Sequence, residues 1–355
     1  MRVPDIFING LGAYIAPTVD ITWAVEQGLY PAADVERHGM ASAAVAGDIP
    51  APEMALFAAQ DAFKRCGWSP TDVDLLLYAS TWHQGPEGWV PYSHLQRQLV
   101  GGHALATEVR QGCNGMFGAL ELAACYLRAE PDRRAALLVA ADNFGTPMLD
   151  RWRMGPGFIV GDAASAVILT KERGFAQLLS VCSGTVPEAE GLHRGNEPLF
   201  PPGITVGRGV DFEARSEEYR LGEISRSVGT LQMIRVQQEL IRVAKRSLSE
   251  AGVGIDQITR VAFMNYSREA VEQRCMAALM LPSSKSTWNF GRTIGHCGAS
   301  DQIISLDELV KTGQLVSGDH MLLIGTGPGV VTSSAIVKIL DSPPWATDQN
   351  QLCLV

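Results

Sequence analysis

A cysteine between a predicted strand and a predicted helix is the first residue of this chain that could do covalent chemistry. Cys113 lies in segment 108–115, EVRQGCNG, and an apolar segment with helical periodicity begins at Met116. At the start of a helix a thiol faces the positive end of the helix dipole, which stabilises the thiolate and so makes the sulfur nucleophilic. The alternative interpretation is a cysteine that only packs, because this residue type is often buried.

A second polar segment, far along the chain, supplies the groups that a thiolate nucleophile needs. His296 and Asp301 lie in segment 295–301, GHCGASD. A thiol, an imidazole base and a carboxylate that orients the base are the parts of a covalent acyl-transfer site. Two simpler interpretations are open: Asp301 as the N-cap of a helix that begins at Gln302, and His296 as a core histidine.

Composition excludes several classes of function. The chain has 355 residues, of which 46% are hydrophobic and 19% charged, enough for one large globular unit or two fused domains. Its net charge is −9 and it has no run of lysine or arginine, which argues against nucleic acid or an anionic membrane as the main partner. We expect a substrate that is a small molecule or is carried on a protein.

The seven cysteines are odd in number and scattered, without the paired spacing of metal ligands. Neither a disulfide framework nor a metal site is therefore predicted. No apolar run approaches the length that spans a membrane, and strand-like residues begin at Ile6. We expect a cytoplasmic protein without a permanently bound cofactor.

An internal repeat indicates how the candidate residues are positioned. Residues 59–80 are echoed by residues 243–265, each with an alanine-rich helical stretch, a glycine, an acidic turn and a strand. The two glycines are 185 residues apart, and an offset of 183 relates Cys113 to His296. Two copies of one α/β unit explain this best. We therefore predict an N-terminal half, residues 1–175, with the cysteine, and a C-terminal half, residues 176–355, with the histidine and Asp301.

In both halves helices alternate with short apolar strands, which predicts an α/β fold with sheets buried under helices. The helix after Cys113 has an apolar stripe that predicts packing in the core: Met116, Leu120, Ala123, Ala124 and Leu127. Segment 183–226 is rich in Gly, Pro, Glu and Arg and lacks apolar periodicity. It is predicted to be a loop region or lid rather than a third domain.

Together these features resemble the ketoacyl synthase III branch of the thiolase-fold enzymes. The resemblance depends on Cys113, the duplicated halves and segments GDAA (161–164) and GTGPG (325–329), and it covers nearly the whole chain. It implies a thiolase fold, with a homodimer of five-layered α/β/α/β/α protomers, and an acyl group carried as a thioester on Cys113. It also implies an acyl donor on phosphopantetheine, from an acyl carrier protein or coenzyme A, and an oxyanion hole made by the backbone N–H groups of Cys113 and Gly329.

The chain departs from the condensing members of that family at two positions. They have a histidine where this chain has Asn265 and an asparagine where it has His296, and they use both to stabilise the species formed when a malonyl thioester loses carbon dioxide. The exchange, with Asp301 five residues after the histidine, resembles a side branch with a Cys-His-Asp site. Its members are acyltransferases (EC 2.3.1) of antibiotic and polyketide pathways, such as those that attach malonyl or 6-methylsalicylyl groups to aminocyclitols and sugars.

Three functions are therefore open. The first is transfer of an acyl group through Cys113 to a hydroxyl or amine of a sugar, cyclitol or similar acceptor, without decarboxylation and with His296 as the base. The second is a decarboxylative condensing or starter-unit-priming enzyme of polyketide or fatty acid synthesis, and the third is a non-catalytic partner of another synthase. Asn265 either hydrogen-bonds the acyl carbonyl or a catalytic water, or only satisfies buried backbone.

Side chains near these segments suggest how substrates are held. Arg151 and Arg153 are candidates to receive an acidic carrier protein or the phosphate of its phosphopantetheine arm. Large apolar residues could line a pocket for an aromatic acyl group, which is therefore favoured, although an apolar core uses the same residue types. These residues are Trp82, Trp89, Met116, Phe117, Met154, Phe158 and Phe200.

Overall fold

Two sets of strands, joined at one point, organise the structure. The computed structural model describes residues 1–155, 157–225 and 231–346. Nine strands follow the order β5-β4-β6-β7-β1-β8-β11-β10-β9, and two short strands, β2 (Thr18–Asp20) and β3 (Ser42–Ala44), form a separate pair. The nine are β1 (Phe7–Ile15), β4 (Val73–Ala79), β5 (Leu105–Val109), β6 (Ala135–Asp142), β7 (Ala163–Thr170), β8 (Ala176–Thr185), β9 (Ile258–Ala262), β10 (His320–Gly327) and β11 (Val331–Ile339).

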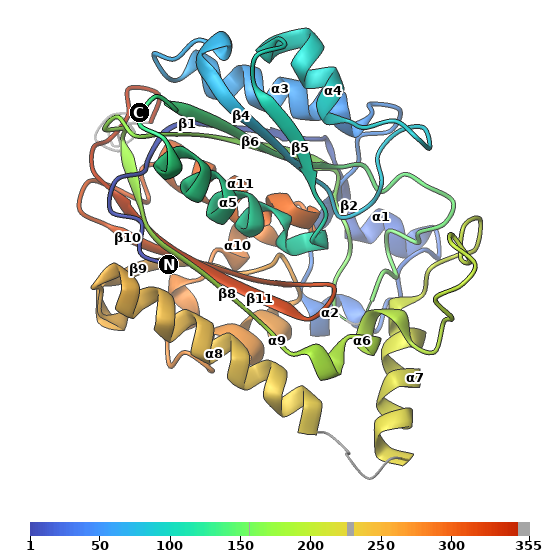
Figure 1. The fold of residues 1–355 in the computed structure, drawn as a ribbon. Coiled ribbons are helices and arrows are strands. Elements are labelled where there is room, and N and C mark those ends of the chain that lie inside the picture. The colour runs from blue at the N-terminus through green and yellow to red at the C-terminus, as the bar shows by residue number, and fades with distance from the viewer. Residues whose placement is uncertain (156, 226–230, 347–355) are drawn as a thin grey trace, which may run out of the picture.

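The join between the two sets is short. β1 pairs with β7 along its length, but with β8 only through Phe7 and Ile8. Away from this point the two sets separate and helices fill the space between them (Figure 1). The described helices are α1 (Ile21–Glu26), α2 (Asp34–His38), α3 (Ala51–Lys64), α4 (Tyr92–Leu95), α5 (Gly115–Ala129), α6 (Gly191–Arg194), α7 (Phe212–Ser225), α8 (Leu231–Ala251), α9 (Arg268–Val271), α10 (Trp288–Gly291) and α11 (Asp301–Lys311).

The layers confirm the predicted fold class. Figure 1 shows α3 outside the first set of strands, α5 and α11 between the two sets, and α8 outside the second. This is the α/β/α/β/α order of the thiolase fold. The repeat is visible in the topology, because β4, β6, β7 and β1 correspond in order to β9, β10, β11 and β8. Helices α5 and α11 occupy equivalent places in the two copies.

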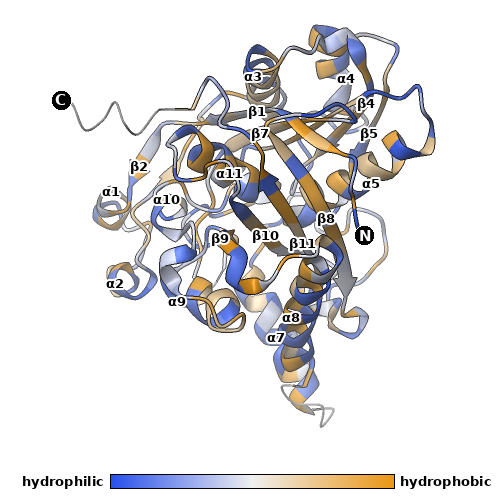
Figure 2. Ribbon diagram, turned by 90° about the vertical axis from the view of Figure 1, so that its left-hand side faces the viewer, coloured by the Kyte–Doolittle hydropathy of each residue, from blue (hydrophilic) through white to orange (hydrophobic). Residues whose placement is uncertain are grey.

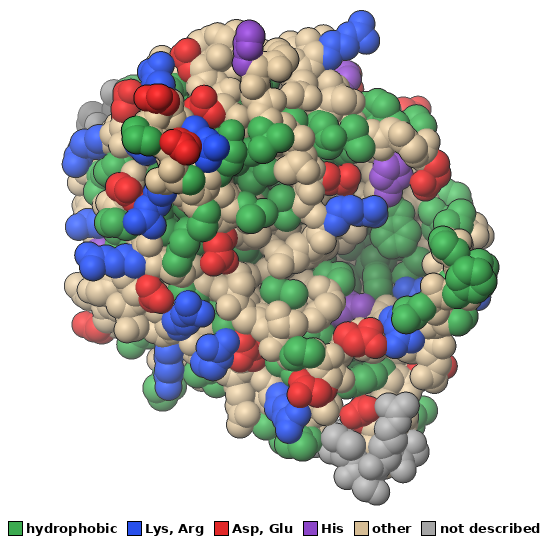
Figure 3. Space-filling model, viewed as in Figure 1, with side chains coloured by type: hydrophobic (Ala, Val, Ile, Leu, Met, Phe, Trp, Pro, Cys, Tyr) green, Lys and Arg blue, Asp and Glu red, His purple; other side chains and the backbone are tan. Residues whose placement is uncertain are grey.

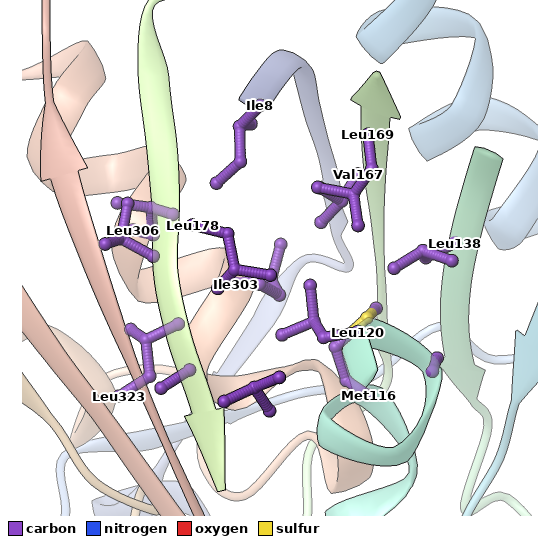
Figure 4. Packing of buried hydrophobic residues seen from close by; sticks show 14 of the residues in the cluster. Ile8, Met116, Leu120, Leu138, Val167, Leu169, Leu178, Ile303, Leu306 and Leu323 are labelled. Carbon is purple, nitrogen blue, oxygen red and sulfur yellow. The ribbon is translucent and has the colours of Figure 1, made fainter. Parts of the chain in front are cut away.

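The layer between the sheets is the hydrophobic core. Figure 4 shows Met116 and Leu120 of α5 and Ile303 of α11 pointing at strand residues such as Leu138 and Leu323. The apolar stripe of α5 is buried throughout, as its periodicity predicts. Burying one such side chain contributes about 2 kcal/mol to the stability of the fold. The packing of α5 and α11 in this core therefore fixes the positions of their first residues.

Segment 183–226 contains more structure than the predicted loop. β8 extends to Thr185, α6 follows, and α7 adds fourteen helical residues up to Ser225, while residue 226 lies outside the described residues. α7 has few apolar residues, so it gives no periodic signal; its Arg220 pairs with Glu217 one turn away, and it packs on α6. Figure 2 shows α7 and α8 with mixed hydropathy, in contrast to the hydrophobic central strands.

In the part of the chain that the structure describes, no helix is both long and apolar enough to cross a membrane. The longest is α8, with 21 residues, and charged side chains recur along it.

Candidate active site

The repeat brings Cys113 and His296 together. Cys113 lies in a single 3-10 turn, Gly112–Asn114, directly before α5, and His296 lies just before the corresponding turn, Gly298–Ser300, that leads into α11. The two turns are in contact between the sheets. As a result His296 Nε2 lies 3.0 Å from Cys113 Sγ. Two residues that are 183 positions apart in the sequence thus form one polar pair, at the starts of the two helices, α5 and α11, that lie between the sheets.

Asp301 completes the arrangement from the first turn of α11. Its Oδ2 lies 2.5 Å from His296 Nδ1. Since a carboxylate accepts hydrogen bonds, it holds the imidazole proton on Nδ1 and leaves the Nε2 lone pair facing the thiol. The carboxylate accepts no hydrogen bond from the N–H groups of α11, for which Ser300 occupies the N-cap position. The capping interpretation of Asp301 is therefore not supported by the geometry.

Asn265, which follows β9, is turned toward Asp301. Its backbone N–H donates to Asp301 Oδ2 and its Nδ2 to Asp301 Oδ1, both at 2.9 Å, and Nδ2 also donates to the carbonyl of Gly295 at 3.0 Å. The residue is buried and does not line the cavity described below. Its amide therefore positions the carboxylate, and this chain has no second imidazole at the position where condensing enzymes carry one.

The electrostatics of His296 follow from these neighbours. Burial lowers the pKa of the imidazole, but the carboxylate of Asp301 and the sulfur of Cys113 outweigh it and raise that pKa well above its usual value. The side chain is a strong base buried beside a thiol. Such a pair can transfer the thiol proton to Nε2 and create a thiolate.

A cavity of about 340 Å³ opens onto the pair. Cys113 and His296 line it, and most of the remaining walls are apolar or aromatic, including Phe144, Phe158 and Phe212. Figure 3 shows the hollow in this face of the molecule, with hydrophobic side chains in its depth and histidine and Lys or Arg side chains at its edge. The volume and lining are typical of a small-molecule site.

Only part of the predicted aromatic lining is correct. Met154 and Phe158 line the cavity. Met116 and Phe117 belong instead to the core between the sheets, where helical periodicity also directs apolar residues. The other three lie elsewhere: Trp82 beside a separate surface pocket, Trp89 against Gly85 in its own loop, and Phe200 on the surface with 77% of its area exposed.

Six polar residues of the cavity were not predicted from the sequence. They are Thr81, His193, Ser216, Tyr266, Arg274 and Thr326. The sequence does contain a signal for Thr81, because this residue follows β4, which is parallel to β5 and β6. The carboxyl ends of parallel strands meet at one edge of a sheet, so residues that follow these strands are expected near a site there. His193 lies in α6, within segment 183–226, and Arg274 lies in the π-helical turn Glu272–Met276 that follows α9, where no pattern marks them.

Burial sets the ionisation of two of these groups. It raises the pKa of Tyr266 to about 12, so this hydroxyl keeps its proton. Burial, with a smaller contribution from the Arg274 cation, lowers the pKa of His193 to about 4, so that imidazole is neutral near pH 7. Tyr266 also packs on the His296 ring, with centroids 5.2 Å apart.

The segment before β7 supports the His296 backbone. Gly161 N–H donates to the His296 carbonyl at 2.9 Å, and His296 N–H donates to the Ile159 carbonyl at 2.8 Å. Arg151 forms a bidentate pair with buried Asp162 in this segment. The prediction that Arg151 receives a carrier protein is therefore wrong, because its guanidinium is committed inside the protein.

Arg153, the other candidate for carrier docking, is exposed and donates to the carbonyl of Gly28. The glycine-rich turn between β10 and β11 reaches the cavity through Gly327, Pro328 and Val330. Gly329, between Pro328 and Val330, has a left-handed backbone conformation with φ 78°. Its N–H as an oxyanion donor, with that of Cys113, stays a prediction.

Across the described ranges, no three His, Cys, Asp or Glu side chains gather as metal ligands would.

Comparison with known proteins places this geometry in a family. Residues 107–187 match the model for 3-oxoacyl-[acyl-carrier-protein] synthase III, and residues 248–339 match the model for its C-terminal part. The curated β-ketoacyl-[acyl-carrier-protein] synthase III of Synechococcus sp. (strain WH7803) is 26% identical over 296 residues, which cover 81% of each chain.

Solved structures of similar proteins agree with this family assignment. One named ChlB3 and described as an acyltransferase is 58% identical, with a TM-score of 0.92, over 97% of this chain and all of that one. The 3-oxoacyl-[acyl-carrier-protein] synthase III of Aquifex aeolicus VF5 is 20% identical, with a TM-score of 0.76, over 94% of this chain and 99% of that one.

The fold and the thiol-imidazole pair define a thiolase-fold enzyme of the acyl-transferring class. More closely, the chain belongs to the family of ketoacyl synthase III-like proteins.

Proposed function

We propose that this protein is an acyltransferase that takes an acyl group from an acyl carrier protein or coenzyme A thioester onto Cys113. It then transfers the group, without decarboxylation, to a hydroxyl or amine of a sugar, cyclitol or similar acceptor. The observation that carries the proposal is the chain of contacts from Asp301 through His296 to Cys113. Such a chain activates a nucleophile, and the amide of Asn265 faces Asp301 rather than the cavity.

In the first half-reaction His296 Nε2 takes the proton of the Cys113 thiol. The thiolate attacks the thioester carbonyl, and the tetrahedral intermediate collapses when its bond to the pantetheine sulfur breaks. The imidazolium returns the proton to that departing sulfur. Asp301 stabilises the imidazolium throughout, which is the task of the acid in a nucleophile-base-acid set.

In the second half-reaction the acceptor enters the cavity after the pantetheine thiol has left. An alcohol is a weak nucleophile at neutral pH and needs a positioned base. His296 Nε2 takes the acceptor proton as the acceptor oxygen or nitrogen attacks the acyl carbon. The bond between that carbon and Cys113 Sγ then breaks, and the imidazolium reprotonates the sulfur.

The relative at 58% identity supports the proposal, because it is described as an acyltransferase and covers nearly the whole chain. An open cavity with mostly apolar walls also suits an acyl group. An acceptor of the sugar or cyclitol class is proposed from the resemblance of the Cys-His-Asp set to antibiotic-pathway acyltransferases.

Intact-protein mass spectrometry tests the first half-reaction. The wild type and Cys113→Ala are each mixed with malonyl, short-chain and aromatic thioesters of coenzyme A and of a carrier protein. We expect a mass gain equal to one acyl group in the wild type and none in the variant. No gain with any donor would contradict the proposal and favour a non-catalytic partner of another synthase.

A condensing or priming enzyme is the second candidate, because the curated relatives are named β-ketoacyl synthases III. The two functions differ in what happens to a malonyl thioester. Release of carbon dioxide that requires Cys113, together with a 3-ketoacyl product, would establish condensation. Retention of the intact malonyl group on the protein supports transfer without decarboxylation.

A further inference from the structure

Cys113 has a second polar neighbour besides His296. The hydroxyl Oγ1 of Thr81 lies 3.9 Å from Cys113 Sγ and is oriented to donate to it. Thr81, Cys113 and His296 all line the same cavity. The distance is near the limit for a hydrogen bond to sulfur, and contacts of this kind are often long in a free enzyme and shorten when charge develops.

Thr81 is held by a buried carboxylate. Asp142, the last residue of β6, has no exposed surface, and its two oxygens accept from Thr81 N–H at 2.8 and 3.0 Å. Asp142 also accepts from Trp82 N–H at 3.1 Å and from Gln84 Nε2 at 3.5 Å, and the side chain of Thr81 partly offsets the rise that burial causes in the pKa of its carboxyl group. No charged side chain pairs with Asp142 in the described residues, so its hydrogen bonds serve to fix the loop after β4.

A glycine shows how closely this pair is packed on the His296 loop. A Cβ atom at Gly298 would lie 2.3 Å from Asp142 Oδ2 and 2.5 Å from Thr81 Oγ1. Both oxygens therefore rest against the turn that leads from His296 to α11. The ends of β4 and β6 and this turn meet at one point, beside the sulfur.

We propose that Thr81 is a further catalytic residue, whose hydroxyl can donate a hydrogen bond to negatively charged Cys113 Sγ, and that Asp142 is its positioning residue. The sulfur is charged in the free thiolate and again when it leaves the acyl group, so the same donor acts in both half-reactions. No proton leaves Thr81, because the thiol and acceptor protons pass to His296. The role in acyl transfer rests on the proposed function, whereas the role in thiolate stabilisation does not.

The single hydroxyl proton of Thr81 can serve the sulfur only when Asp142 does not take it. Burial raises the pKa of Asp142 to about 7, in spite of its backbone hydrogen bonds, so a large share of the molecules has a neutral carboxyl group near that pH. A neutral carboxyl donates to Thr81 Oγ1 and leaves the hydroxyl hydrogen free for Sγ. An amide in its place would do the same.

The test compares Thr81→Val, which keeps the shape and removes the hydroxyl, with Thr81→Ser, which keeps the hydroxyl. The rate of alkylation of Cys113 by iodoacetamide is measured near neutral pH, with peptide mapping to separate Cys113 from exposed Cys125. We expect Thr81→Val to be about tenfold slower than the wild type, which corresponds to about 1.4 kcal/mol, and Thr81→Ser to be within about threefold of it. Ultraviolet absorbance of the thiolate should fall in the valine variant alone.

Asp142→Asn tests the positioning residue, because its amide mimics the neutral carboxyl group. We expect it to be alkylated at nearly the wild-type rate, while Asp142→Asn in the Thr81→Val protein changes nothing further. Alkylation of Thr81→Val at the wild-type rate would overturn the proposal for Thr81. A loss in Asp142→Asn as large as that in Thr81→Val would overturn the role given to Asp142.

Acylation by thioesters separates the two proposals. If Thr81→Val is alkylated slowly but the wild type accepts no acyl group from any donor, the proposed function fails and the role of Thr81 in thiolate stabilisation stands. If the wild type is acylated and Thr81→Val is alkylated normally, the proposed function stands and this inference fails.

Discussion

At the scale of single residues, the candidate site depends on one carboxylate. Asp301 accepts four hydrogen bonds, from the backbone and side chain of Asn265, from His296 and from Cys297 N–H at 2.7 Å, and has no exposed surface. Because every acceptor site is used, the carboxylate cannot turn away from the imidazole. The orientation of His296 is therefore built into the fold before any substrate binds.

Asp301→Asn should lower the rate of Cys113 acylation by about a hundredfold or more, since an amide can present N–H to Nδ1 and favour the wrong tautomer. Stopped-flow or quenched mass measurement of acyl-Cys113 gives the rate. Asp307→Asn is the matched control: Asp307 lies in the same helix, is buried and pairs with Arg65 at the end of α3. Equal losses in both variants would show that Asp301 matters only for folding.

A second residue-scale prediction concerns stability against pH. Burial raises the pKa of Asp142 to about 7, above its value of about 4 in an unfolded chain. The folded state therefore binds a proton at Asp142 more tightly than the unfolded state does. This binding stabilises the fold to its whole extent below about pH 4, and the stabilisation is lost as the pH rises toward 7. The free energy of unfolding of the wild type minus that of Asp142→Asn should fall by as much as about 4 kcal/mol over that range. Urea unfolding at several pH values measures it, and a constant difference would contradict the shift.

At the scale of elements, the candidate site is built at the ends of strands and the starts of helices. Cys113 precedes α5 and His296 precedes α11, while Thr81 and Asn265 follow β4 and β9. The segment that ends at β7 supports the His296 loop through two backbone hydrogen bonds. Displacement of that segment should therefore reach the imidazole directly.

Gly161→Ala tests this connection. A Cβ atom there would lie 2.0 Å from the carbonyl oxygen of Ile294, so the segment or the His296 loop must move. We expect acylation to slow by about tenfold or more, because a misplaced base of even about 1 Å costs much of its effect, together with a lower melting temperature. Gly67→Ala is the control, as nothing lies within 4 Å of a Cβ at that position. Full activity of Gly161→Ala would show that the loop adapts without cost.

At the scale of the whole molecule, one edge of the large sheet is open. β5 pairs with β4 on one side, and in the described residues no strand pairs with its other side. Leu105 on that edge exposes 54% of its surface. Exposed apolar strand edges invite pairing with another chain, which fits the homodimer implied by the resemblance to ketoacyl synthase III.

We therefore expect a dimer in which the two protomers pair along their β5 strands. Sedimentation equilibrium of the wild type should give twice the mass of one chain, and Leu105→Glu should shift the protein toward the monomer, because a charged side chain on a strand edge opposes pairing with another chain. Exposed Leu221, on α7 and far from that edge in sequence, is the site of the control variant Leu221→Glu. A wild type that sediments as a monomer, or a Leu105→Glu dimer as tight as the wild type, would count against this interface.

The sequence by itself determined the duplicated α/β organisation, because a repeat at a constant offset is independent of how the chain packs. It also determined the helical stripe after Cys113 and the candidate set of Cys113, His296 and Asp301, whose types and neighbours carry the chemical signal. Only the tertiary structure decided that Asn265 faces Asp301, that Arg151 is paired inside the protein, and that Phe117 serves the core while Phe158 serves the cavity. Apolar periodicity says that a side chain is buried, but burial against a sheet and burial against a cavity require the same residue types, so long-range packing alone separates them.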